Sequence, residues 1–132
     1  MKKPPTPAFH SAQEAAQAQA VAALHGELLS KVGNDLAIAR ELAHSLDVHH
    51  REDVDALLLA IRQEQWEEVG RYAHRILNTA QLLGCSALVQ LCLRVEAVIA
   101  GEGGSARAAL LAGYVPVVEQ LRTVLERLSR TF

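Results

Sequence analysis

Residues 66–84 read WEEVGRYAHRILNTAQLLG, and their spacing decides the fold. At the helical step of about 100° per residue, the apolar positions of this stretch gather on one side. These positions are Val69, Tyr72, Ile76, Ala80 and Leu83. The opposite side is made by Glu67, Gly70, Arg71, His74, Asn78 and Gln81. The stretch is therefore predicted to form an amphipathic helix that lies on a larger apolar core.

His74 lies in the middle of the polar side of this helix and is predicted to face solvent. Its neighbours on that side are small or polar, so packing does not explain an imidazole there. An ordinary imidazole titrates near pH ~6.5, so at neutral pH a large share is uncharged and offers a lone-pair nitrogen. His74 is thus a candidate reactive group, able to serve as a base, a ligand or a nucleophile.

Length and composition favour a single all-α domain. The chain has 132 residues, of which 50% are hydrophobic, and this is enough to bury one core. Only 4% are aromatic, and Ala and Leu dominate the apolar residues. The β-branched residues are scattered rather than alternating, which suits helix-on-helix packing.

Charge and hydropathy narrow the possible partners. The formal net charge is -2, and Lys and Arg form no basic stripe beyond Lys2 and Lys3, so the electrostatic footprint of a nucleic-acid binder is missing. The apolar run at residues 56–61 is far shorter than the ~20 residues of a membrane span. The proline-rich start lacks the apolar core of a signal peptide. We therefore expect a cytoplasmic protein without membrane contact.

The cysteines and the histidine cluster do not predict a metal site. Cys85 and Cys92 are seven residues apart and lack CxxC spacing, so we expect reduced thiols in the core rather than zinc ligands or a disulfide. His44, His49 and His50 lie close in sequence, but on one helix they point in different directions. No metal ligand is predicted.

The start of the chain and the first helix are placed by local signals. Residues 1–10 contain three prolines and resemble the end of an interdomain linker or a cloning remnant. The bundle domain is therefore expected over residues 11–132. Ser11 and Glu14 match a capping box, which predicts a helix from about residue 11, and Gly33 ends it.

Four further helices follow, with caps expected at Asn34 and Ser86. A kink is expected near His49, and Gly113 and Pro116 are expected to kink or split the last helix. Connections this short favour antiparallel neighbours. The predicted architecture is an antiparallel up-and-down four-helix bundle with an additional N-terminal helix. The four helices are predicted over residues 34–61, 66–83, 86–100 and 105–128.

The face around His74 does not support chemistry of its own. It holds no Ser or Cys for a base to activate, and no glycine-rich phosphate loop or catalytic carboxylate pair accompanies the histidine. A nucleophile that takes a group from another protein needs less. It needs exposure, room, and a partner that keeps the other ring nitrogen protonated. We therefore expect no autonomous enzyme activity.

The residues around His74 resemble the histidine phosphotransfer (HPt) domain, especially the modules that end hybrid sensor kinases. The resemblance rests on AHRI at 73–76, on Gly84 ten positions after His74, and on LCLRVE at 91–96. It implies a helical bundle in which His74 accepts a phosphoryl group from a receiver-domain aspartate and passes it to another receiver. It also implies that Glu96, at a position where the family has Glu or Gln, accepts a hydrogen bond from the inner ring nitrogen.

Two residues depart from the family pattern His-x-x-Lys-Gly. Leu77 takes the lysine position, which removes a cation from beside the phosphoryl group, and Asn78 adds bulk at the glycine position. Arg71 and Arg75 are candidates to supply the missing charge, and Gly70 is a candidate to restore room. Three readings stay open: ordinary relay, relay with altered partner choice or phosphoryl stability, and a module that binds a receiver or kinase without transfer.

The resemblance also implies the partners. A receiver is expected to dock on the face of the second and third predicted helices, with its own Mg²⁺ and no cofactor on this chain. A sensor histidine kinase is the other expected partner, and the chain is expected to be a monomer. The alternative that the chain is the dimerisation helix pair of a sensor kinase is disfavoured, because an acidic residue usually follows the histidine in those helices, whereas Arg75 follows His74 here. The expected receiver contacts are Gly70, Arg71, Arg75, Leu77, Asn78 and Gln81.

Overall fold

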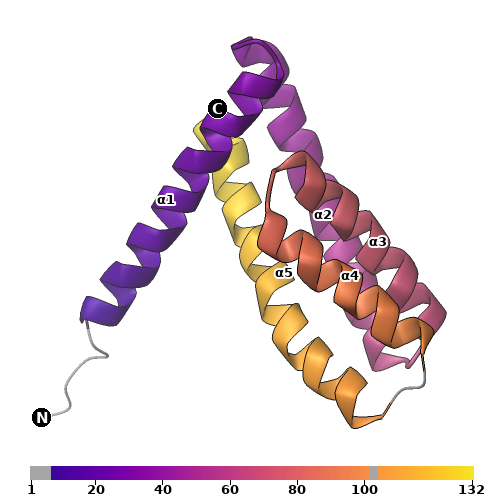
Figure 1. Cartoon of the computed structure of the whole chain (residues 1–132). Coiled ribbons are helices and arrows are strands. Elements are labelled where there is room, and N and C mark those ends of the chain that lie inside the picture. Colours follow the sequence, from indigo (N-terminus) through magenta and orange to yellow (C-terminus); the bar gives the residue numbers. More distant parts are fainter. Residues whose placement is uncertain (1–6, 102–103) are drawn as a thin grey trace, which may run out of the picture.

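A computed structural model describes residues 7–101 and 104–132 of the chain. In these residues the chain forms five helices and no strand (Figure 1), so the all-α prediction is confirmed. The helices are α1 (Pro7–Lys31), α2 (Leu36–Arg62), α3 (Trp66–Leu82), α4 (Ser86–Ala100) and α5 (Ser105–Thr131).

Helices α2 to α5 form the predicted up-and-down four-helix bundle. α3 packs between α2 and α4, and α5 closes the bundle by packing against both α4 and α2. α1 is the additional helix. It lies against α5 and α2 at its C-terminal end and diverges from the bundle toward its N-terminal end (Figure 1). Short turns join consecutive helices, which makes them antiparallel neighbours.

The core is filled by aliphatic side chains from all five helices. Leu28, Leu57, Ile76, Val95 and Leu125, one from each helix in chain order, are fully buried. Burying one such side chain contributes about 1.5–3 kcal/mol relative to leaving it in water. α3 therefore holds its place through one apolar side, and its other side is free for a different role.

α1 begins earlier than predicted. It starts at Pro7, four residues before Ser11, so the predicted start is wrong and part of the expected linker is helical. Proline suits the first helical position, because the amide that it lacks would have no partner there. Residues 1–6 of the expected linker lie outside the described residues.

α2 is capped by Asp35 and not by Asn34. Oδ1 of Asp35 accepts a hydrogen bond from the amide of Ile38 at 3.1 Å, which satisfies one of the unpaired donors of the first turn. Asn34 instead has a positive φ of 63°, which Asn tolerates better than most residues, and it turns the chain between α1 and α2. α2 then continues without a break through His49.

α5 is one helix and is not split at Gly113 or Pro116. Tyr114 and Val118, on either side of Pro116, are fully buried. Their packing against the bundle outweighs the ~3 kcal/mol that an interior proline costs a helix. By length and composition alone α5 passes for a membrane-spanning helix, but its apolar side, from Leu111 to Leu128, is buried in the bundle.

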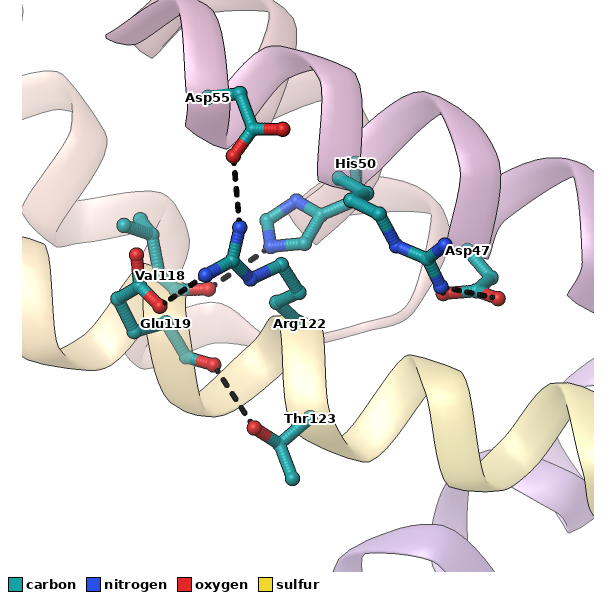
Figure 2. A network of polar contacts seen from close by, with 8 residues as sticks. Asp47, His50, Asp55, Val118, Glu119, Arg122 and Thr123 are labelled. Carbon is teal, nitrogen blue, oxygen red and sulfur yellow. Dashed lines mark hydrogen bonds and ion pairs between the residues drawn. The ribbon is translucent and has the colours of Figure 1, made fainter. Parts of the chain in front are cut away.

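Polar contacts fix α5 against α2, as Figure 2 shows. Arg122 of α5 donates to Asp55 of α2 at 2.8 Å and to Glu119 of its own helix at 2.6 Å. Nε2 of the buried His50 donates to the carbonyl oxygen of Val118 at 3.0 Å. Burial lowers the pKa of His50, so the imidazole stays neutral between the two helices. These contacts set the axial register of α2 and α5.

Candidate functional site

His74 stands on the outer side of α3, as its position in the helical pattern predicted. Its side chain is 59% exposed, and its Nδ1 lies 2.9 Å from Oε1 of Glu96 on α4. A carboxylate can only accept, so Nδ1 carries the proton in this contact. In the neutral imidazole, the outer nitrogen, Nε2, then has the lone pair on an exposed ring. The contact expected between these two residues is present.

The antiparallel packing of α3 and α4 brings the two residues together. Gly84 ends α3 with a φ of 70°, a left-handed conformation that glycine adopts readily, and α4 begins two residues later at Ser86. Ser86 is the first helical residue rather than the cap. The turn sets His74 opposite Glu96, and one turn earlier a Cβ on Gly70 would lie 3.6 Å from Ile99.

A buried contact between α4 and α5 lies one helical turn before the glutamate. Sγ of Cys92, one turn before Glu96 on α4, lies 3.4 Å from the hydroxyl of Tyr114 on α5. Both side chains are fully buried, and burial raises the pKa of each. Cys92 and the half-buried Cys85 are free thiols, as expected. Periodicity could not have revealed that Tyr114 supports the helix that carries the glutamate.

The structure places most of the predicted receiver contacts around His74. Arg71, Asn78 and Gln81 are exposed on the same side of α3, and Gly70 is half-buried beside α4. Leu77 is the exception. It is only 4% exposed, so the prediction that it contacts a receiver is wrong. Three residues after His74 the helix has turned this position to the core, where it packs in the apolar cluster.

The two arginines near His74 have different partners. Nε of Arg75 lies 2.9 Å from Oδ1 of Asp53 on α2, whose side chain is only 6% exposed. Burial raises the pKa of Asp53, and the Arg75 guanidinium opposes that rise. Arg71, whose side chain is 63% exposed, pairs with Glu68 one turn away on its own helix. An exposed ion pair of this kind contributes about 0–1 kcal/mol, so it costs less free energy to move Arg71 to another partner than to move Arg75.

The role of Asp53 was not predicted from the sequence. A signal was present, since Leu46, His50, Asp53 and Leu57 follow the spacing of the buried side of α2. A carboxylate on that side needs a cation within reach, because burying an unpaired charge is costly. The partner could not be identified without the packing of α3 against α2.

Replacing Arg75 by Ala is expected to lower the free energy of unfolding by about 2 kcal/mol at pH ~7, because the buried Asp53 carboxylate loses its cation. In the folded Arg75→Ala variant, no guanidinium opposes the effect of burial, so the pKa of Asp53 lies further above its value in the unfolded chain than it does in wild type. The native state therefore takes up the extra proton as pH falls, and the deficit shrinks toward pH ~4. Urea unfolding at several pH values measures this.

Two variants control this experiment. Arg71→Ala removes an exposed arginine from the same helix and is expected to change stability by less than about 0.5 kcal/mol. Asp53→Asn in the Arg75→Ala background removes the titrating group and is expected to abolish the added pH dependence. An Arg75→Ala deficit that is equal at neutral and acidic pH would show that the pair does not hold Asp53 ionised.

The fold and site define a class of protein: a helical bundle that presents one imidazole, with its inner nitrogen held by a carboxylate. Residues 48–131 match the family model of the Hpt domain. The chain is 32% identical over 99 residues to the virulence sensor protein BvgS of Bordetella bronchiseptica, and 31% identical over 99 residues to that of Bordetella parapertussis. Each match covers 74% of this chain but 7% of the relative. No solved structure gives a significant match.

The chain therefore belongs to the Hpt domain family. It is a phosphotransfer module of a phosphorelay, which belongs to two-component signal transduction. Domains of this family carry phosphoryl groups and have no kinase activity of their own.

Proposed function

We propose that His74 is the phosphoryl acceptor of this module, taking the group from an aspartyl phosphate of one receiver domain and passing it to the aspartate of another. The observation that carries the proposal is the contact between His74 Nδ1 and Glu96, 2.9 Å long, which places the single proton of the neutral imidazole on Nδ1 and so gives Nε2 the lone pair on a ring that is 59% exposed. An acceptor must be both nucleophilic and reachable, and this arrangement supports both conditions.

The transfer conserves atoms and charge. The lone pair of Nε2 attacks phosphorus, the bond between phosphorus and the aspartyl oxygen breaks, and its electron pair returns to the aspartate as a carboxylate. The imidazole gains positive charge as the N–P bond forms. Glu96, which accepts from Nδ1, stabilises that charge. Transfer to the second receiver runs these steps in reverse.

The chain needs little machinery beyond this pair. Mg²⁺ bound to the receiver would neutralise the phosphoryl oxygens, so positioning and charge neutralisation would supply most of the catalysis, and we propose that this module needs no cofactor of its own. Arg71 takes the place of the family's lysine, since it is exposed on the side of His74 and its ion pair with Glu68 is an exposed one. Gly70, Asn78, Gln81 and the aliphatic stem of Arg75 complete the contact surface.

The proposal extends to partners and place. The chain spans 7% of the length of the sensor proteins that it matches, so we propose a sensor histidine kinase as its functional partner or parent chain. Receiver domains of response regulators are the other partners. We further propose that the domain, whose first helix begins at Pro7 rather than at residue 11, works as a monomer in the cytoplasm and makes no membrane contact.

The rival reading is a module that binds a receiver or kinase without accepting a phosphoryl group. It is favoured by one observation, the loss of the family's lysine at Leu77 together with the exposed Asn78 at the glycine position. Titration of the chain with a receiver, combined with phosphoryl transfer, separates the two. Binding without uptake of label supports the rival, and uptake excludes it.

The experiment that tests the proposal is phosphotransfer profiling. The chain is mixed with each of a panel of receivers that carry radiolabelled aspartyl phosphate, and label is followed on both proteins. Transfer to this chain, in a form that is stable to base and labile to acid, is the expected result. Label that is absent with every receiver, in a chain shown to bind one of them, would overturn the proposal.

Replacing Glu96 by Ala is expected to slow phosphoryl uptake about 10–100-fold, because Nδ1 loses the acceptor that holds the ring and stabilises its developing charge. Glu96 acts through His74 and is a positioning residue. Glu96→Gln keeps an acceptor oxygen and is expected to recover much of the rate. Rapid-quench kinetics against pH measures both variants, and a rate for Glu96→Ala equal to wild type would contradict the role.

A further inference from the structure

α4 presents an uncharged strip to solvent beside the His74 site. Leu93, Ala97 and Ala100 follow i, i+4, i+7 spacing, so they lie along one side of the helix, and all three are exposed. Leu93 is 45% exposed and is one of five large apolar side chains that are exposed in the part of the chain that the structure describes; on α4 it is the one among them. The bundle leaves this strip uncovered, although it buries the opposite side of α4 at Leu88, Cys92 and Val95.

The register of α3 and α4 places this strip next to His74. Leu93 precedes Glu96 by three residues, and residues three apart on a helix are neighbours on its surface. Glu96 itself touches His74, so Leu93 lies within about 5 Å of that level along the bundle axis, at 1.5 Å per residue. Gly70, one turn before His74, and Ala97, next to Glu96, add little side-chain bulk at this level of the two helices.

The other flank of His74 has a different character. On the α2 side of α3 lie Arg71 with Glu68 and Arg75 with Asp53, which are charged pairs. The histidine thus stands between the ion pairs on its α2 side and, on its α4 side, Glu96 with the uncharged strip next to it. The receiver contacts predicted from sequence were all on α3, and none of them was an exposed apolar side chain.

We propose that the receiver domain that exchanges phosphate with His74 also rests on α4, with Leu93 as the apolar contact of that interface. The inference rests on the proposed function. An interface of standard size buries about 800 Å² on each partner, which is a patch much wider than one helix, and its centre is more apolar than its rim. A receiver that brings an aspartate to Nε2 therefore covers the neighbouring strip of α4.

The strip selects a partner by shape and apolar character. Ala97 and Ala100 present only methyl groups, so a receiver helix can approach closely, and Leu93 then fits against aliphatic side chains of that helix. Charged groups at the same place on a receiver would lose water without gaining a partner, which disfavours them. Leu93 is accordingly a residue that determines receiver specificity.

Leu93→Ser tests this inference, with Leu36→Ser as the matched control. Leu36 is 61% exposed and is 17 residues from Asp53 on α2, about 25 Å along the helix. For Leu93→Ser we expect kcat/KM for uptake from a phosphorylated receiver to fall about 10-fold, as for a well-placed interface residue. Leu36→Ser is expected to match wild type, and Leu93→Met, which stays apolar, is expected to keep most of the rate.

Phosphoramidate serves as a small donor that needs no docking surface. Leu93→Ser is expected to take label from it at the wild-type rate. An equal loss with phosphoramidate, an equal loss in Leu36→Ser, or no loss with any receiver would overturn the inference. So would a concentration-dependent mass for wild type that Leu93→Ser abolishes, because a second copy of the chain would then cover the strip. Failure of the proposed function itself gives a different result, namely no label on wild type from any receiver, or label that does not depend on His74.

Discussion

His74→Gln is expected to take up no phosphoryl label from any receiver that labels the wild-type chain. Glutamine has no lone-pair nitrogen that can form an N–P bond, so the loss is complete rather than partial. The side chain is 59% exposed, so the substitution leaves the core of the bundle intact. Circular dichroism and thermal unfolding should therefore match wild type. Label retained after denaturing electrophoresis measures the effect.

His44→Gln is the matched control for this variant. His44 is an exposed histidine of α2, at a level of that helix beyond the end of α3, and its replacement is expected to leave labelling unchanged. The wild-type label should disappear in acid and survive in base, as a phosphorus–nitrogen bond does. Label that persists in His74→Gln would assign the acceptor to another residue and refute the proposed role of His74.

Leu77→Lys is expected to destabilise the fold by about 3 kcal/mol and to give no faster transfer. The variant restores the family's lysine in sequence, but Leu77 is 4% exposed and packs in the apolar core. The substitution removes the apolar contacts of a buried leucine, which alone costs about 2–5 kcal/mol, and it forces an ammonium group to reach for water. For a domain of this size the melting temperature should fall by roughly 10 °C.

Two variants make this prediction decisive. Leu77→Met conserves apolar volume and is expected to cost less than about 1.5 kcal/mol. Asn78→Lys places the cation at an exposed position one turn after His74 and is expected to leave stability within about 0.5 kcal/mol of wild type. A Leu77→Lys protein that is as stable as wild type and transfers faster would show that this position opens to the receiver after all.

Helical periodicity was enough to predict the bundle and the exposure of His74. The apolar rhythm around His74 fixes which side of α3 is buried, and one face of a helix cannot be both core and surface. The hydrogen-bond partner of the His74 ring could not be predicted from periodicity. Glu96 was identified by resemblance to a family, because no pattern within one helix tells which residue of another helix will lie opposite.

The errors have a common physical origin. Leu77 was assigned to the receiver surface from its place in a motif, although its angle on the helix directs it to the core beside Ile76 and Ala80. The continuity of α5 through Pro116 and the pairing of Arg75 with Asp53 depend on tertiary packing. Local preferences of a few kcal/mol yield when a whole apolar side becomes buried.

The inner nitrogen of His74 is hydrogen-bonded to Glu96, so the ring has one nitrogen, Nε2, that can take a phosphoryl group. Under the proposed function, the receiver that donates the phosphoryl group and the receiver that accepts it must bind at the same nitrogen, one after the other. The first receiver has to dissociate before the second can bind. The rate at which phosphoryl groups pass through this module is then limited by how fast each receiver dissociates. Long-lived complexes would stall the signal, so brief, modest-affinity encounters suit this carrier best.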